Sequence, residues 1–170
     1  MKNFFVYLTI IFITIILQTS FIPSFFSENL FPDIVLMLVL AWSIIDGFDD
    51  FISWIIIAGL IYDFLSFSVP GVHVIIFAAV AYMNSFFSRR FTFGFNLVGI
   101  SLVAFFVFSA TLISYGVDLL PILVEYNFRI NLSNILNLVY TVSLNAAFFV
   151  LLYYSIKKIK IFFYIKNERK

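Results

Sequence analysis

Few side chains in this 170-residue sequence could take part in chemistry, because cysteine is absent and His73 is the single histidine. Without cysteine the chain cannot form a disulfide, a thiolate metal site or a catalytic thiol. Asp63, Ser66, Ser68 and His73 are close in sequence and are of the types found in a hydrolytic triad. Their spacing does not indicate triad geometry, and neither serine lies in a nucleophile-elbow sequence. We therefore predict no catalytic residue, no metal site and no cofactor, and expect that the protein is not an enzyme.

Asp63 needs an explanation first, since it falls inside an apolar stretch that is typical of a membrane span. An ionisable side chain at the centre of a span costs about 2.5–3.5 kcal/mol and is a functional candidate by default. Asp63 lies near the predicted outer end of its span, and Gly59, one turn earlier, leaves room for another helix to approach. Two interpretations stay open: an aspartate that locks helix packing near the interface, or a proton or ligand site.

Asp33 belongs to a group of acidic and polar residues that the predicted topology gathers at the outer face. It follows Pro32 at the start of a span, where proline fits the first helical turn and a carboxylate caps free amide groups. The group has two interpretations, a solvated rim or a polar docking surface for another membrane protein. Its members are Asp33, Asp63, His73, Asp118 and Glu125, with Arg129 as the nearby basic residue.

Polar side chains follow one face of the last apolar segment, at steps of three and four residues that keep them on the same side of a helix. Amides inside lipid seek hydrogen bonds from neighbouring helices, each worth about 0.6–2 kcal/mol, so this face is expected to point inward or toward a partner. Thr14 and Gln18 of the first span are the natural candidates to meet it. The stripe consists of Asn134, Asn137, Thr141 and Asn145.

The composition determines the setting of these residues, because 64% of the chain is hydrophobic and only 11% is charged. A soluble domain of this size leaves about 30% of its chain surface in water, and the sequence has too few polar residues to cover it. This excludes a cytosolic enzyme and a nucleic-acid-binding module. Crossing about 30 Å of hydrocarbon takes about 20 residues. We predict an all-α integral membrane protein, a compact bundle of six transmembrane helices in one domain over 1–170. The predicted spans are 4–22, 32–45, 51–67, 72–87, 93–117 and 134–156, followed by a basic cytoplasmic tail, 157–170.

Basic residues are distributed unevenly between the two sides of this predicted bundle. Six spans put both termini on one side, and placing them in the cytoplasm leaves Arg129 as the only basic residue outside. The acidic turn Asp46–Asp50 lies inside as well, without a basic residue of its own. Arg89, Arg90 and the basic tail attract anionic lipid headgroups by about 1 kcal/mol per charge, so the bilayer itself is a partner.

The order of these features resembles the rod shape-determining protein MreD family over nearly the whole chain. The sequence departs from the family at Phe67, where a small residue is more usual. The resemblance rests on Gln18 closing the first span, Pro32-Asp33 and Trp42 in the second, the run GLIYDFLSFSVPGVH over residues 59–73, and Tyr82, Asn145 and the basic end.

The resemblance implies a non-enzymatic scaffold in the bacterial cytoplasmic membrane, one subunit of the elongation (rod) complex that maintains cell shape and directs lateral peptidoglycan synthesis. The implied partners are MreC, bound directly, with MreB, RodA and a class B penicillin-binding transpeptidase in the same complex. The family also resembles the six-helix substrate-binding subunits of energy-coupling-factor transporters, so the alternative function is a vitamin-like small-molecule binding subunit. The expected partner-binding or structural polar residues are Gln18, Pro32, Asp33, Gly59, Asp63, Pro70, Gly71, His73 and Asn145.

Overall fold

The structure is a computed structural model that describes residues 2–26, 31–66, 69–88, 101, 103–114, 116 and 132–162. All regular structure in these ranges is helical, which confirms the all-α prediction for this part of the chain. The helices are α1 (Lys2–Ile16), extended by a π-helical turn (Leu17–Phe21) and a 3-10 turn (Ile22–Ser24), α2 (Ile34–Asp46), α3 (Phe48–Leu65), α4 (Val72–Ser88), the helix Val103–Ser114 and α6 (Leu132–Phe162).

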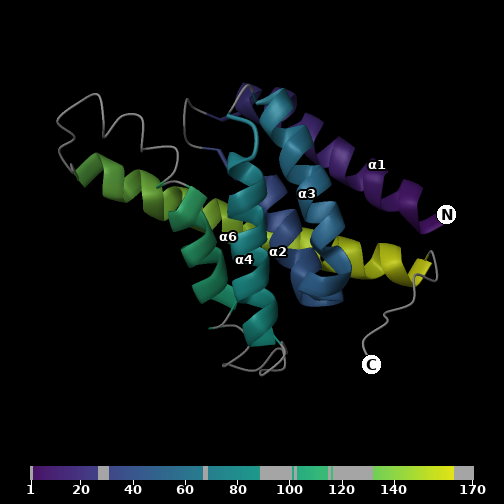
Figure 1. Cartoon of the computed structure of the whole chain (residues 1–170). Coiled ribbons are helices and arrows are strands. Elements are labelled where there is room, and N and C mark those ends of the chain that lie inside the picture. The colour runs from purple at the N-terminus through teal and green to yellow at the C-terminus, as the bar shows by residue number, and fades with distance from the viewer. Residues whose placement is uncertain are drawn as a thin grey trace.

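Helix α2 lies at the centre of the bundle. Every residue from Ile34 to Ile45 is buried, because α1, α3, α4 and α6 all pack against this helix. Figure 1 shows α3 and α4 running side by side in front of α2, with α6 crossing behind them. A helix that is apolar on every face is stable only when it is enclosed. The sequence of α2 therefore fixes its central position.

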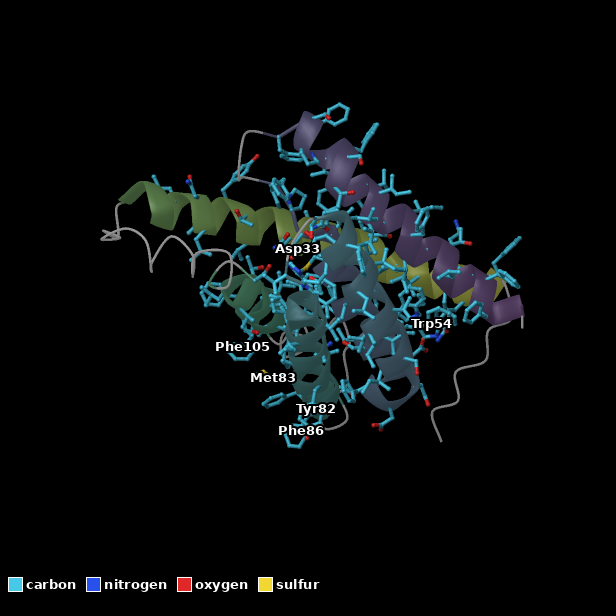
Figure 2. All side chains as sticks on the ribbon, turned by 45° about the horizontal axis from the view of Figure 1, so that its top comes forward. Asp33, Trp54, Tyr82, Met83, Phe86 and Phe105 are labelled. Carbon is cyan, nitrogen blue, oxygen red and sulfur yellow. The ribbon has the colours of Figure 1, made fainter. Side chains whose placement is uncertain are left out.

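The helices around α2 carry exposed apolar side chains at helical spacing. Figure 2 shows this on α4, where Tyr82, Met83 and Phe86 point outward, and on the neighbouring helix at Phe105. An apolar outer surface around an apolar core is typical of a protein that contacts lipid, since soluble monomers rarely expose such large patches. On α3 the exposed stripe is Ile52, Ile56, Leu60 and Phe64.

Helices α3 and α4 form a tight hairpin with the closest backbone approach at Gly59. A Cβ atom at residue 59 would lie 2.7 Å from the backbone of Val74, so only glycine fits there. Gly71, with φ of 96°, supplies the turn that brings α4 back along α3. The room that the sequence predicts beside Gly59 is therefore filled by the next helix of the same chain.

Two helices are long and apolar enough to cross a membrane by length and composition, Phe4–Ser24 and Leu136–Phe162. Ile34–Asp46, Val72–Phe87 and Val103–Ser114 are apolar but shorter. Of the predicted span 93–117, the structure describes residues 101, 103–114 and 116, and the other residues of this span lie outside the described ranges. The helical content is confirmed, whereas the count of six spans stays a prediction.

The described helices differ in extent from several of the predicted membrane spans. Helix α2 begins at Ile34 rather than at residue 32, because Asp33 is its N-cap and Pro32 precedes the cap. The acidic loop Asp46–Asp50 is reduced to Gly47, whose φ of 87° reverses the chain in one residue and leaves Asp49 and Asp50 in the first turn of α3. Helix α6 continues to Phe162, so the start of the predicted tail is helical.

Gly59→Ala is expected to destabilise the packing of α3 against α4. Backbone atoms of Val74 cannot move aside as a flexible side chain would, and overpacking typically costs about 1–3 kcal/mol. The expected readout is a lower midpoint of thermal unfolding in detergent. Gly116→Ala is the matched control, because a Cβ at residue 116 meets nothing within 4 Å. Equal midpoints for the two variants would contradict the close approach of the helices.

Candidate functional site

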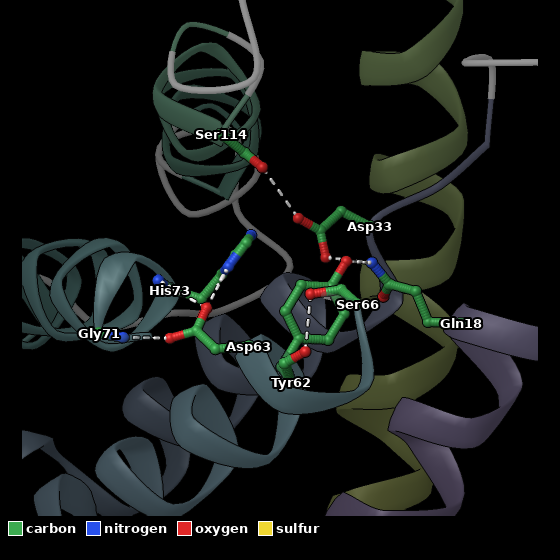
Figure 3. A network of polar contacts seen from close by, with 8 residues as sticks. All are labelled: Gln18, Asp33, Tyr62, Asp63, Ser66, Gly71, His73 and Ser114. Carbon is green, nitrogen blue, oxygen red and sulfur yellow. Dashed lines mark hydrogen bonds and ion pairs between the residues drawn. The ribbon is translucent and has the colours of Figure 1, made fainter. Parts of the chain in front are cut away.

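Asp33 is the centre of a polar network at one end of the bundle (Figure 3). Its Oδ1 accepts hydrogen bonds from Leu36 N and from Gln18 Nε2, both at 3.0 Å. Its Oδ2 accepts from Ser114 Oγ at 3.0 Å. One carboxylate thus caps α2 and ties two other segments to it, which fits the preference of a helix N-terminus for a negative charge.

Gln18 joins three helices through one amide group. Its Nε2 donates to Asp33 and to Tyr62 Oη at 2.8 Å, while its Oε1 accepts from Val35 N at 2.7 Å. Gln18 lies in the π-helical turn at the end of α1, a local distortion that often occurs at functional positions. The amide uses its donor and acceptor sides inside the protein, so its role here is to fix helix ends.

Asn145 brings α6 into the same network. Its Oδ1 accepts from Asp33 N at 2.8 Å, and its Nδ2 donates to Thr111 Oγ1 at 2.9 Å. The predicted meeting of the α6 stripe with the first span is therefore indirect, since Gln18 and Asn145 both bind Asp33. Thr14 does not take part, because its hydroxyl donates to the carbonyl of Ile10 in its own helix.

Asp63 is buried and holds the turn between α3 and α4. Its Oδ2 accepts from Gly71 N at 2.6 Å, and its Oδ1 accepts from His73 N at 3.2 Å and lies 2.6 Å from His73 Nδ1. The His73 ring packs edge-on against Tyr62, with ring centroids 4.5 Å apart. Three backbone and side-chain groups compensate the desolvated carboxylate, as a buried charge requires.

Tyr62 connects the Asp33 network to the Asp63 turn. It accepts a hydrogen bond from Gln18, and it precedes Asp63 on α3. We call this connected set the Asp33 end. Its members are Gln18, Asp33, Tyr62, Asp63, Gly71, His73, Thr111, Ser114 and Asn145. Most of the described bonds join members of this set to one another or to amides in the first turn of α2, an arrangement suited to holding helices in place.

A second polar cluster lies at the other end of α2, and we call it the Asp46 end. Lys160 of α6 forms an ion pair with Asp46, and both side chains are largely buried. Tyr7 Oη donates to the second oxygen of Asp46 at 3.2 Å, and its ring packs against Trp42 and Trp54. This cluster ties the start of α1 and the end of α6 to the C-terminus of α2.

Polar contacts also join α2 and α3 to α4 near this end. Asn84 Nδ2 donates to Ser43 Oγ at 2.6 Å and to the carbonyl of Leu40 at 3.1 Å. Ser85 Oγ accepts from Phe48 N at 3.0 Å, which satisfies an amide in the first turn of α3. Such interhelical bonds contribute about 0.6–2 kcal/mol each in a membrane setting.

The predicted site residues fall into two adjoining groups at the Asp33 end. Gln18, Asp33 and Asn145 bond to one another, and Pro32 is buried just before the cap. Asp63 bonds to Gly71 and His73 in the α3–α4 turn, where Gly59 lies beside Val74 and Pro70 is exposed. The cap at Asp33 is present as predicted, and partner binding by any of these residues stays a prediction. Asn134 has no described side chain, and Asp118, Glu125 and Arg129 lie outside the described residues.

Lys160 and Tyr7 of the Asp46 end were not predicted. The acidic turn has no basic residue of its own, and Lys160 lies in the predicted tail, beyond the predicted end of the last span at residue 156. Lys160 lies four residues beyond Ile156 and eleven beyond Phe149, both buried, so it continues the inner face of α6. This spacing could have identified Lys160 as an inward-facing lysine.

The described residues thus define a class, a helical membrane protein whose polar side chains join helix ends. The family model described as rod shape-determining protein MreD matches residues 1–162. The chain belongs to this family of bacterial membrane proteins, which has a role in determining rod shape. No curated protein and no solved structure matches the chain. The expected likeness to substrate-binding subunits of energy-coupling-factor transporters therefore stays a prediction.

Lys160→Met is expected to lower the free energy of unfolding by about 3–5 kcal/mol, because Asp46 is then left buried without its ion partner. Lys158→Met is the matched control on the same helix, since Lys158 is exposed. The double variant Asp46→Asn/Lys160→Met should recover part of the loss. Tryptophan fluorescence during unfolding in detergent measures all three, and equal losses for Lys160 and Lys158 would contradict a buried pair.

Proposed function

We propose that the chain is a non-enzymatic scaffold subunit of the bacterial elongation complex and that it binds MreC. Membership of the MreD family supports the general role. The observation that carries the proposal is the pattern of hydrogen bonds at the Asp33 end, where the polar groups are directed at one another. Such a network is more typical of a rigid bundle that presents a binding surface than of a site that transforms a substrate.

The directions of the helices support six crossings with both termini in the cytoplasm. Helix α1 runs from the Asp46 end to the Asp33 end, α2 returns, and α3 and α4 repeat the two directions. The helix Val103–Ser114 finishes at the Asp33 end with Ser114. Helix α6 then runs from Asn145 at the Asp33 end to Lys160 at the Asp46 end. The basic residues favour the cytoplasm for the Asp46 end.

The surface proposed for MreC lies around the α3–α4 turn at the Asp33 end. Three apolar side chains there are about 70% exposed: Phe64, Val69 and Ile75. Asp63 is buried beneath them, so it contributes by holding the turn rather than by touching a partner. The transmembrane helix of MreC would pack on this apolar face, with its adjacent periplasmic segment over the turn.

The remaining partners are assigned to the opposite side by the same topology. Asp49 and Asp50 are exposed in the first turn of α3, at the Asp46 end, and face the proposed cytoplasm. Asp46 is bonded to Lys160 and Tyr7, which makes it a structural residue. Contacts with MreB, and association with RodA and the class B penicillin-binding transpeptidase, are proposed as properties of the assembled complex.

Cysteine labelling tests the topology cleanly, because the chain has no cysteine of its own. Val69→Cys is expected to react with a membrane-impermeant maleimide in intact cells after the outer envelope layer is made permeable. Asp50→Cys should react only after the cytoplasmic membrane is opened, since it lies on the other side. Labelling of both positions from the same side would contradict the proposed crossing of the membrane by α3 and the proposed orientation.

Phe64→Ala/Val69→Ala is expected to reduce the MreC that copurifies with a tagged chain from native membranes by about fivefold. Truncating two exposed anchors of an apolar interface removes about 1 kcal/mol or more. Phe162→Ala is the matched control, because Phe162 is equally exposed but lies at the Asp46 end of α6. Mass spectrometry of the bound proteins, beside imaging of depleted cells for rounding, measures the effect.

Asp63→Leu separates the structural role from the binding role in the same experiment. It breaks the turn that Gly71 and His73 close, so folded protein should be lost along with MreC.

Copurification of a transporter ATPase and a membrane coupling subunit, with cell shape unchanged on depletion, would overturn the scaffold in favour of small-molecule binding.

A further inference from the structure

Tyr62 lies where the α3–α4 turn adjoins the cap of α2. Figure 3 shows it between the Asp63–His73 pair on one side and the Gln18–Asp33 pair on the other. Asp63, the next residue, accepts the hydrogen bonds that close the turn, and Gln18 accepts from an amide at the start of α2. Tyr62 therefore lies beside both groups that hold the Asp33 end together.

Three different parts of Tyr62 make contacts at this place. Its ring packs edge-on against His73, with ring centroids 4.5 Å apart, and at a tilt against Phe77, with centroids 6.0 Å apart. Its backbone carbonyl accepts from Ser66 N at 2.9 Å and from Ser66 Oγ at 2.7 Å, which completes the end of α3. Its hydroxyl accepts from Gln18 Nε2 at 2.8 Å. The ring and the carbonyl thus hold the turn, whereas the hydroxyl joins the turn to α1.

The amide of Gln18 is not free to follow a displaced hydroxyl. An amide side chain has two N–H donors and one carbonyl oxygen. The donors go to Asp33 Oδ1 and Tyr62 Oη, and the oxygen accepts from Val35 N in the first turn of α2. Gln18 is only 2% exposed, and a buried donor that loses its partner is costly. The hydroxyl of Tyr62 is therefore held at a defined place relative to α2.

The apolar side chains proposed to contact MreC belong to the same turn. Phe64 follows Tyr62 by two residues, Val69 lies between the two helices, and Ile75 follows His73 by two. Each of the three is about 70% exposed, so contacts inside the protein do little to fix it. Their arrangement depends on the residues that hold the backbone of the turn. A surface binds more tightly when its parts are fixed before the partner arrives.

We propose that Tyr62 is a positioning residue for the MreC surface, because the hydrogen bond between its hydroxyl and Gln18 sets the α3–α4 turn relative to α1 and the cap of α2. The inference rests on the proposed function and names a residue that regulates the affinity of its surface from beneath. Tyr62 is half-buried and acts through the exposed side chains of the turn. The coupling is reciprocal, so a partner bound to the turn also restricts the junction of α1 with α2.

A distance between two spin labels tests the positioning without any partner. The chain has no cysteine of its own, so labels at Val69→Cys on the turn and Phe12→Cys on α1 report a single distance. Tyr62→Phe removes only the hydroxyl and is expected to broaden the distribution of this distance. Tyr82→Phe is the matched control, because Tyr82 is exposed and its hydroxyl has no hydrogen bond to a described residue. A distribution that is unchanged in Tyr62→Phe would overturn the proposal.

Copurification of MreC, measured per amount of folded chain, tests whether the positioned turn is the surface that binds. We expect Tyr62→Phe to lower the recovered MreC about fivefold, the effect typical of losing one hydrogen bond. In the Phe64→Ala/Val69→Ala background the same substitution should have no further effect, because the surface through which it acts is already lost. Unchanged recovery in Tyr62→Phe, or a further fivefold loss in that background, would overturn the role of Tyr62 in binding.

A second background tests whether Tyr62 acts through Gln18. Tyr62→Phe should add nothing to the loss of MreC that Gln18→Leu causes alone, since both remove the same bond. An additive loss would overturn this route. If Gln18→Leu does not fold, the spin-label distances and the Phe64→Ala/Val69→Ala background still decide the question. If the unaltered chain recovers no MreC, the proposed function fails, whereas the spin-label distances still show whether Tyr62 positions the turn.

Discussion

Helix α2 has no polar face, and the arrangement of the other described helices follows from enclosing it. A fully apolar helix leaves polar groups only at its termini, where amides and carbonyls lack partners within the helix. Water is scarce in a membrane interior, so these groups need partners from the protein. Asp33 and Gln18 satisfy the amides at the N-terminus, and Gly47 donates to the carbonyl of Ser43 at the C-terminus. The two polar clusters are thus consequences of one apolar segment.

Each polar cluster binds α1 and α6 to α2, and the two clusters together determine the positions of α1 and α6. Asp33 bonds with Asn145, and Asp46 with Lys160, which fixes α6 along α2 at two points. Tyr7 and Gln18 do the same for α1. Apolar packing alone leaves helices in a membrane free to slide, because lipid is as apolar as the neighbouring side chains. The few polar side chains therefore carry most of the specificity of the fold.

Interactions between residues close in sequence could be predicted from the sequence, whereas contacts between distant helices could not. The hairpin of α3 and α4 was predictable, since Gly59, Asp63 and Gly71 lie within one short stretch and their chemistry indicates a tight turn. Gln18 and Asn145 were identified as inward-facing amides, yet their shared partner was not, because Asp33 meets them through tertiary packing. Lys160 was missed because it lies in the predicted tail, although α6 continues through it to Phe162. Charge alone was a poor guide to where a helix stops when the charge is buried and paired.

The hydrogen bond between the backbone of Asp33 and Asn145 also constrains the order in which the protein is completed. A ribosome makes α2 early, yet the amide of its N-cap, Asp33, receives this partner from a residue 112 positions later. The polar groups at both ends of α2 therefore stay incompletely paired until α6 is made. During that time the intervening helices are inserted while the N-terminus of α2 and Asp46 still lack their partners from α6. Loss of the last helix would affect the second one most, so a chain interrupted during synthesis exposes the groups that a membrane quality-control protease can recognise.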